Sequence, residues 1–154
     1  MRAPRILWRL IRIGPRAAYA LGLGPLIGSF VLLLTTYGRR TGRPRVTPLL
    51  YERLGDTYRV ASARGPLADW LRNVKANPKV MIQVARRKFY ALAEVTDNAE
   101  QIADYIGRQL ARNPTVFGII LRSEGLPPAP SRADLVRWAP KRPMVIIRPI
   151  GDDA

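Results

Sequence analysis

The chain contains no cysteine and no histidine, and this double absence excludes much of the common chemistry of protein sites. Without cysteine there is no disulfide framework, and without either residue there is no zinc site of the usual Cys/His kind. A Ser-His-Asp triad, a cysteine–histidine pair and a histidine general base are excluded as well. If the protein is an enzyme, we therefore expect a bound cofactor to supply the chemistry and the protein to position it.

Acidic residues are also scarce. The 154 residues include 11 Asp and Glu against 26 Lys and Arg, which gives a net charge of +15, and most of the excess is arginine. Such a field attracts nucleic acid, an anionic membrane, or a small ligand with several phosphates or carboxylates. The hydrophobic fraction of 47% is that of an ordinary globular protein, so we expect one folded domain whose partner is anionic.

Long hydrophobic runs are few, and the longest is interrupted. Residues 17–34 carry no charge, but three glycines and Pro25 break the run, so we expect neither a membrane span nor a cleaved signal peptide. Residues 2–16 interleave arginine with aliphatic residues at helical spacing, which predicts a basic amphipathic helix. This helix could lie on anionic lipid or pack on the domain. We divide the chain into residues 1–24, this helix and its linker, and residues 25–150, the folded domain.

The segment from Thr35 to Tyr51 is the most informative part of the sequence. The apolar runs Phe30–Leu34 and Val46–Tyr51 predict strands on either side of a turn that contains two glycines and four arginines: Gly38, Gly42, Arg39, Arg40, Arg43 and Arg45. Glycine tolerates positive φ, so the backbone can fold tightly and bring its N–H groups close to a ligand. Arginine offers a planar donor fork that suits phosphate and carboxylate. We interpret the segment as an anion-binding turn; the alternative is a solvated basic hairpin.

The remaining sequence alternates predicted strands and helices. Strands are predicted over Leu49–Arg53, Thr57–Ser62, Val80–Ala85, Lys88–Val95 and Met144–Arg148. Helices are predicted from Asp69 to near Asn77, over Ala99–Arg112 with Thr96 or Asp97 as the N-cap, over Thr115–Arg122, and over Arg132–Trp138 with Ser131 as the N-cap. Hairpins dominate this order, so we expect an α+β fold in which mainly antiparallel strands form a small barrel or a strongly curved sheet.

Four blocks of residues resemble one known family. They are Thr-Thr-x-Gly-Arg-Arg-Thr-Gly-x-Pro-Arg-x-x-Pro-Leu at positions 35–49, Ala61-Ser62, Asp69-Trp70-x-x-Asn73-x-x-Ala76-Asn77-Pro78, and Arg142-Pro143. Together they resemble the deazaflavin-dependent nitroreductase family over about residues 25–149. The resemblance implies a split β-barrel of the FMN-binding type with flanking helices. It also implies coenzyme F420, a deazaflavin that carries a phosphodiester and an oligoglutamate tail; FMN is the alternative cofactor.

The resemblance also implies a set of cofactor-binding residues. These are Gly38, Arg39, Arg40, Thr41, Gly42, Arg45, Pro48, Ala61, Ser62, Arg64, Trp70 and Asn73. The turn would hold the phosphate and the glutamyl carboxylates, while Ala61 and Ser62 would lie along the deazaflavin ring, with Trp70 and Asn73 beside it. Each also has a structural alternative: Trp70 as a core anchor, Asn73 as a loop bridge and Ser62 as an ordinary strand-end serine. Arg64 lies in a shorter loop than the one found in some relatives.

The implied reaction is hydride transfer from reduced deazaflavin to an apolar electrophile, namely a quinone, an activated alkene or a nitroaromatic. No catalytic side chain and no metal are assigned; Tyr51, Tyr58, Tyr105 or solvent could supply a proton. The alternatives are an F420- or FMN-binding protein without turnover and a basic nucleic-acid-binding barrel. We expect no nucleic-acid partner, because the aromatic residues are not interleaved with the basic ones. We expect a cytoplasmic protein, with peripheral attachment to the inner face of the membrane and a homodimer both left open.

Overall fold

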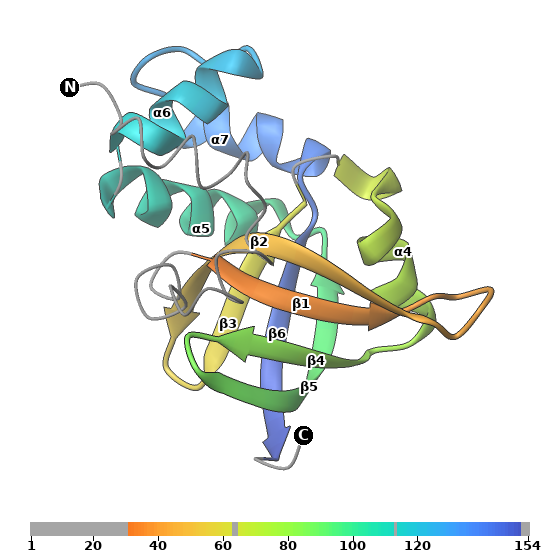
Figure 1. Cartoon of the computed structure of the whole chain (residues 1–154). Helices are drawn as coiled ribbons and strands as arrows, with labels where there is room; N and C mark the ends of the chain where they lie inside the picture. Colours follow the sequence, from red (N-terminus) through yellow and green to blue (C-terminus); the bar gives the residue numbers. More distant parts are fainter. Residues whose placement is uncertain (1–30, 63–64, 113, 152–154) are drawn as a thin grey trace.

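The structure is a computed structural model, and it describes residues 31–62, 65–112 and 114–151. In these ranges six strands form a closed antiparallel barrel with helices outside it (Figure 1). The strands are β1 (Val31–Tyr37), β2 (Pro44–Leu54), β3 (Thr57–Ala61), β4 (Lys79–Val84), β5 (Arg87–Thr96) and β6 (Met144–Gly151). The helices are α4 (Asp69–Ala76), α5 (Ala99–Arg112), α6 (Pro114–Ser123) and α7 (Arg132–Trp138), with short 3-10 turns η1 (Gly65–Leu67) and η2 (Ala139–Lys141). The expected α+β barrel is confirmed.

The strand order around the barrel is β1-β2-β3-β6-β5-β4, and β4 pairs with β1 to close it. Consecutive strands form the hairpins β1–β2, β2–β3 and β4–β5, while the C-terminal strand β6 inserts between β3 and β5. Closure removes the free strand edges that would otherwise pair with other chains. The β1–β2 hairpin keeps its register up to the pair Tyr37 and Pro44, so the arginine turn begins directly at the barrel rim.

Alternating side chains along the strands separate two hydrophobic cores. On β3 and β6, Tyr58 and Val145 belong to the barrel interior, whereas Met144 and Ile146 belong to a second core beneath the helices. This is the two-residue period of a strand whose two faces are both covered. The helical core is completed by residues of α5, α6 and α7, including Ile102, Ile106, Leu121, Leu135 and Trp138. One barrel face is therefore buried under a helical layer, as Figure 1 shows.

Helix α4 packs against the mouth of the barrel and lies beside the β1–β2 turn (Figure 1). Its Trp70, Leu71 and Val74 join the barrel core, with Leu71 and Val74 almost fully buried. The helix ends before Pro78, as the sequence predicts, because proline disfavours helical geometry in the residue before it. This packing fixes the adjacent side of α4, which carries the exposed Asp69 and the buried Asn73, next to the turn.

The helix caps agree with the sequence at one helix and differ at another. Ser131 caps α7 and forms a capping box with Asp134, as the residue pattern predicts. For α5 the expected cap at Thr96 or Asp97 is wrong: the Asn98 Oδ1 accepts the backbone N–H of Gln101 at 3.0 Å. Thr96 instead belongs to the end of β5, where its hydroxyl accepts the N–H of Asn98. Because β5 pairs with β6 as far as Thr96, helix α5 begins later in the chain than the expected caps imply.

Two strand boundaries also differ from the expectation. The first strand runs to Tyr37, beyond the predicted end at Leu34, because Thr35, Thr36 and Tyr37 pair with β2. The overlapping segments predicted around Leu49 are a single strand that pairs with β1 along its first half and with β3 along its second half. Residues 1–30 lie outside the described residues, so the predicted amphipathic helix and the boundary at residue 24 stay predictions.

Candidate functional site

The β1–β2 turn is held by its own backbone. The N–H of Gly38 donates to the carbonyl of Arg43 at 2.8 Å, and the N–H of Gly42 donates to the carbonyl of Gly38 at 2.8 Å. Gly42 has a φ of +68°, and a Cβ at Gly38 would lie 2.7 Å from the Thr41 Oγ1. The glycines are therefore needed for the shape of the turn. The N–H groups of the two glycines are used within the turn, so any backbone N–H group that the turn offers to a ligand comes from its other residues.

Arg39 connects the turn to helix α4. The Asn73 Oδ1 accepts the backbone N–H of Arg39 at 3.2 Å and its Nη1 at 2.9 Å, while the Arg39 Nη2 lies 3.2 Å from the Asp69 Oδ1. The Asn73 Nδ2 donates to the Thr36 Oγ1 at 3.4 Å on β1. Asn73 is 3% exposed, so this amide is a buried link between three segments. The structure thus supports the loop-bridge interpretation of Asn73 and makes Arg39 a residue that positions the turn.

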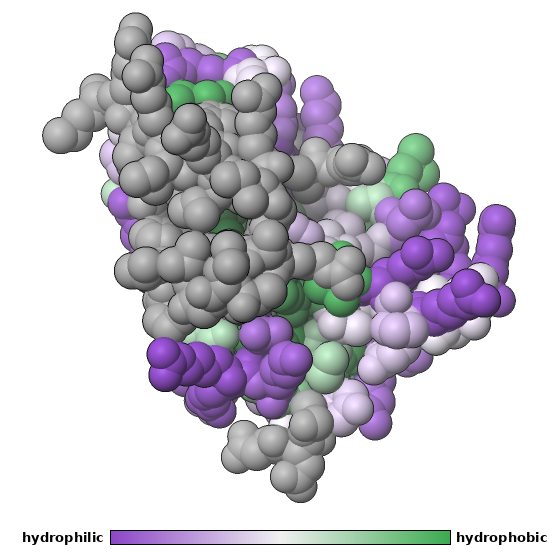
Figure 2. All heavy atoms as spheres, in the orientation of Figure 1, coloured by the Kyte–Doolittle hydropathy of each residue, from purple (hydrophilic) through white to green (hydrophobic). Residues whose placement is uncertain are grey.

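A cavity of about 650 Å³ lies between the turn and α4. It is lined by Gly38, Arg39, Arg40, Thr41, Pro44, Arg45, Val46, Thr47, Asp69, Trp70 and Asn73. Figure 2 shows hydrophilic side chains gathered over this turn, at the right of the view. The size is within the range of small-molecule sites. The structure therefore brings seven of the twelve predicted site residues to one cavity: Gly38, Arg39, Arg40, Thr41, Arg45, Trp70 and Asn73.

The charge of this cavity is unbalanced. Asp69 is the one acidic residue among the described lining residues, and it pairs with Arg39. Arg40 and Arg45 line the cavity without an ion pair to any residue that the structure describes. A guanidinium group without a carboxylate partner is available to an anion, and its geometry matches phosphate and carboxylate oxygens. The site is therefore suited to a ligand with at least two negative charges.

The lining of the cavity also includes an aromatic residue and apolar residues. Trp70 is 8% exposed and both packs in the barrel core and lines the cavity, so its two alternative roles are combined. Pro44 and Val46 add apolar contacts from β2. A search of the described residues finds no group of three His, Cys, Asp or Glu able to hold a metal ion. The arrangement can bind and orient a polyanion with a planar apolar part, and it supplies no nucleophile–base pair.

Four of the remaining predicted site residues are described, and they do not line this cavity. Ser62 is fully buried, its Oγ donates to the carbonyl of Gly65 at 2.6 Å, and its N–H donates to the carbonyl of Pro143. Pro48 is exposed on β2, Ala61 packs against the helical core, and Gly42 shapes the turn. Arg64 lies outside the described residues. The contacts of Ser62 are those of its structural alternative.

Four lining residues are absent from the sequence-based set: Pro44, Val46, Thr47 and Asp69. The first three lie beside Arg45 at the start of strand β2. This position next to the turn would have been enough to include them in the predicted set. Asp69 belongs to the third of the four family blocks, and the resemblance implies no role for it. Its position follows from the packing of α4 on the barrel, which sequence spacing does not show.

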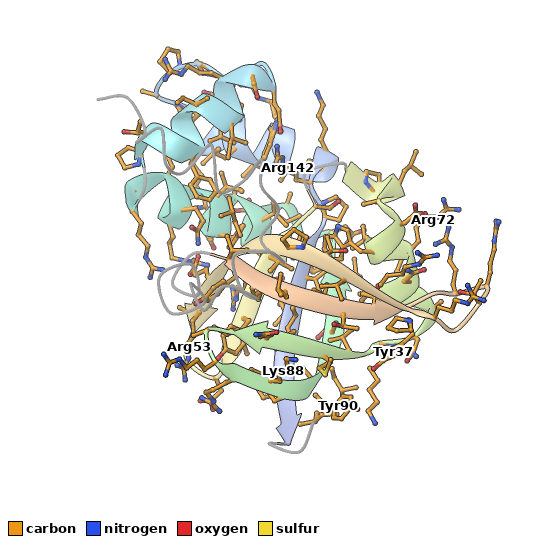
Figure 3. The ribbon with its side chains drawn as sticks, viewed as in Figure 1. Tyr37, Arg53, Arg72, Lys88, Tyr90 and Arg142 are labelled. Carbon is orange, nitrogen blue, oxygen red and sulfur yellow. The ribbon has the colours of Figure 1, made fainter. Side chains whose placement is uncertain are left out.

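A second group of charged residues binds the helical layer to the barrel. Glu52 on β2 is 1% exposed; its Oε1 accepts the Arg108 Nε at 2.6 Å and its Oε2 accepts the Gln109 Nε2 at 3.0 Å. Arg142 pairs with Glu124, with its Nε 2.8 Å from the carboxylate, and its Cζ lies 5.0 Å from the centre of the Trp138 ring. Figure 3 shows Arg142 beside α7, on the helical side of the molecule. These contacts hold layers together and lie outside the cavity.

Tyr105 on α5 lies within the same polar group. Burial, and after it the negative charge of Glu52, raise the pKa of the Tyr105 phenol well above its usual range. Burial also lowers the pKa of the Arg142 guanidinium. Neither Tyr105 nor Tyr58, which is 4% exposed in the barrel core, lines the cavity. Two of the three tyrosines considered as proton donors are therefore buried away from the candidate site.

Comparison with known proteins gives a consistent picture. The sequence model of the family described as "F420H(2)-dependent quinone reductase" matches residues 16–117, which is more than half of the chain. A curated relative, the F420H(2)-dependent quinone reductase of Mycobacterium tuberculosis, is 42% identical over 66 residues. That match covers 41% of this chain and 44% of the relative, so it spans less than half the length of the curated protein.

Solved structures share the fold at low sequence identity. A structure titled F420-H2 dependent reductase aligns with a TM-score of 0.52 and 21% identity, covering 77% of this chain and 93% of the other. A conserved hypothetical protein of Mycobacterium tuberculosis aligns with a TM-score of 0.58 and 15% identity, covering 84% and 79%. The heme storage protein HutZ of Vibrio cholerae aligns with a TM-score of 0.54 and 21% identity, covering 79% and 82%. These likenesses support the barrel architecture.

Proposed function

The chain belongs to the F420H(2)-dependent quinone reductase family, and from this premise we propose that it is an oxidoreductase that binds coenzyme F420 between the β1–β2 turn and α4. The observation that carries the proposal is the pair Arg40 and Arg45, which line the cavity without a carboxylate partner among the described residues. F420 has a phosphodiester and glutamyl carboxylates, so its charge complements this wall. When bound in its reduced form, the deazaflavin supplies a hydride, which fits a chain without cysteine and histidine.

Separate residues would perform separate tasks in this site. Arg40 and Arg45 would bind the phosphate and the tail, while Trp70 would offer an aromatic surface to the planar ring. Arg39 is already held by Asn73 and Asp69, so we assign it the task of fixing the turn rather than binding the anion. Binding and orientation are then the main contributions of the protein to the rate.

We propose a quinone as the acceptor, with activated alkenes and nitroaromatics as the alternatives to be tested. Two observations support a quinone: the description of the family and the apolar side of the cavity at Pro44, Val46 and Trp70. Reduction of a quinone to a hydroquinone takes one hydride and one proton. Since Tyr51, Tyr58 and Tyr105 do not line the cavity, we assign the proton to solvent.

The proposal is tested by titrating the full chain with F420, FMN and a single-stranded oligonucleotide. We expect F420 to bind most tightly, and we expect Arg40→Gln and Arg45→Gln each to weaken it by roughly tenfold, since a lost hydrogen bond to a charged group costs about 1.5–3 kcal/mol. Arg112→Gln is the matched control, because Arg112 is exposed on α5 and has no ion pair with a described residue. Equal affinities for F420 and oligonucleotide, unchanged in both site variants, would refute the proposal.

Turnover is a separate measurement. Loss of reduced F420 is followed with a quinone, an activated alkene and a nitroaromatic, each at the same concentration. Faster oxidation by the quinone supports the acceptor assignment, and a preference for either alternative overturns it. Tight F420 binding without oxidation by any of the three would indicate a binding protein without turnover. FMN binding as tight as F420 binding would favour the flavin alternative.

We also propose a cytoplasmic location with peripheral membrane attachment through residues 2–16, which suits a membrane-held quinone. The support is the pattern of arginine and aliphatic residues in that segment, which lies outside the described residues. In the described part of the chain, no helix has the length and apolarity needed to cross a membrane. Flotation with anionic liposomes, compared between the full chain and a deletion of residues 1–16, tests the attachment. Equal flotation of the two proteins would refute it. Light scattering of the purified chain tests the homodimer.

A further inference from the structure

A second cavity lies at the barrel end where the β2–β3 and β4–β5 hairpins turn. Its volume is about 450 Å³, and arginines at positions 53, 86 and 87 lie around it. Figure 3 shows Arg53 at the lower left of the barrel, whereas Arg72 of α4 marks the opposite side, near the first cavity. The two cavities share no lining residue. The second cavity is therefore separate from the proposed F420 site.

The inner surface of this cavity is apolar. Tyr58 and Phe89 belong to the barrel core, and their ring centres lie 5.8 Å apart. Val84, at the end of β4, packs against the same core and lines the cavity beside them. Tyr58 and Phe89 are only 4% and 3% exposed, so a ligand that enters here would place its apolar group mainly against the half-buried Val84 and Ala85. This contact is favourable because it removes apolar surface from water.

The rim of the cavity is cationic. The Arg53 Cζ lies 5.8 Å from the centre of the Tyr58 ring, and the Arg87 Cζ lies 5.5 Å from the centre of the Phe89 ring. No Asp or Glu is among the lining residues described here. Arg86 is exposed and has no ion pair with any described residue. A purely structural explanation is that Arg53 and Arg87 stack on the two rings and cover the core. This explanation does not account for Arg86.

The tight turn between β4 and β5 places Arg86 at the rim of the cavity. Ala85 has a φ of +54°, and it is the one non-glycine residue with positive φ among the described residues. Such a conformation is unfavourable for alanine, but a two-residue hairpin turn requires positive φ, so the turn itself accounts for it. Here it lies directly before Arg86 and Arg87 in a two-residue turn, and it fixes the path of the chain that brings them to the rim.

We propose that this cavity binds a small amphiphilic anion. The apolar body of the ligand would rest against Val84 and Ala85, above the buried rings of Tyr58 and Phe89, and a single carboxylate, sulfonate or phosphate would be bound by the arginines of the rim. The proposal is independent of the F420 site, because it rests on other residues at another end of the barrel.

Naphthalene-2-sulfonate is a suitable probe, and its binding is followed by amide chemical-shift changes in the full chain. We expect the shifts to concentrate at residues 53–58 and 84–89. We also expect Arg53→Gln and Arg86→Gln each to raise the dissociation constant by roughly tenfold. Arg112→Gln is again the matched control and should bind as the unmodified chain does. The neutral naphthalene-2-sulfonamide and inorganic sulfate should each bind more weakly than the probe, since each lacks one half of the interaction.

The first cavity also attracts anions, so the titration is repeated in the Arg40→Gln/Arg45→Gln variant. Shifts at residues 53–58 and 84–89 that persist there support the second site, whether or not F420 binds to the protein. Unchanged affinity in the Arg53→Gln/Arg86→Gln variant would overturn the proposal. It would also be overturned by shifts confined to the β1–β2 turn, or by sulfate binding as tightly as the probe.

Discussion

The arginines of the helical layer and those of the β1–β2 turn have opposite surroundings. Arg108 and Arg142 each bind a carboxylate, Glu52 and Glu124, in the interface between barrel and helices. Arg40 and Arg45 have no such partner among the described residues. Burying a charged side chain away from water costs free energy unless the charge is paired. A charged side chain at an open cavity remains hydrated and needs no partner within the protein. Glu52 and Glu124 thus compensate the arginines beside the helical layer, whereas Arg40 and Arg45 keep an uncompensated charge at the cavity.

Arg39 belongs to the turn by sequence and resembles the helical layer in its contacts. It is bound by the buried Asn73 and by the exposed Asp69, so its guanidinium is already engaged. The turn thus combines one anchored arginine with two available ones, Arg40 and Arg45. Substitutions in the layer should therefore change stability, substitutions of the available arginines should change affinity, and substitutions at the anchor should change both.

The largest effect is expected from Glu52→Gln. Glu52 is 1% exposed, and Arg59 lies directly opposite it in the β2–β3 register; the Nε of Arg59 and the Nη2 of Arg108 are buried without a hydrogen-bond partner in the described structure. Loss of the carboxylate leaves buried positive charge, so we expect the free energy of unfolding to fall by about 3 kcal/mol, measured by urea titration.

The control is Glu94→Gln, because Glu94 pairs with Arg148 at 2.8 Å in an exposed ion pair. This variant should change stability by less than about 1 kcal/mol. F420 affinity should be unchanged in both, since neither carboxylate lines the cavity. Equal destabilisation by Glu52→Gln and Glu94→Gln would contradict the prediction that the buried carboxylate contributes more to stability than the exposed one.

Asn73→Ala should affect both stability and binding. The substitution leaves the backbone N–H and the Nη1 of Arg39 without their acceptor, which should cost about 2 kcal/mol. The turn would then lose its connection to α4, and F420 affinity should fall as well. Asn77→Ala is the matched control on the same helix, because its Oδ1 accepts only an exposed backbone N–H, from Lys79. Lower stability with unchanged F420 affinity would show that the anchor has no effect on the site.

Tyr105, in the helical layer, should make the free energy of unfolding depend on pH in the alkaline range. Its pKa is raised in the folded state, so the phenol keeps its proton after the unfolded chain has lost it. The resulting stability is fully present below pH of about 10 and should decline above it by about 1.4 kcal/mol per pH unit. Tyr105→Phe should remove this part of the slope in unfolding experiments at alkaline pH. An identical slope in the variant would contradict the assignment.

The smallest effect is expected from Asp69→Asn. Its side chain is 83% exposed, so its ion pair with Arg39 is screened and stability should change by less than about 0.5 kcal/mol. The substitution removes the one described carboxylate of the cavity, and F420 affinity should rise by about twofold at low salt. Weaker F420 binding in this variant would mean that Asp69 is needed to hold Arg39 in place.

Much of the fold could be predicted from the sequence because the local signals are strong and agree. Alternation in residues 57–62 and 88–95 predicts β3 and β5, and Ser131 predicts the start of α7. The α5 cap was misplaced because several residues before Ala99 can accept a backbone N–H, and only the length of β5 selects Asn98. The closure of the barrel by β1 and β4 has no local signal, since it joins segments far apart in the chain.

The candidate site shows the same division. Residue types and their spacing are enough to exclude cysteine and histidine chemistry, to show the excess of positive charge, and to place glycines and arginines in one turn. Which of these arginines are available to a ligand depends on the packing of α4, because this packing brings acceptors to the turn. Asn73 and Asp69 engage Arg39, while Arg40 and Arg45 have no acceptor within reach among the described residues.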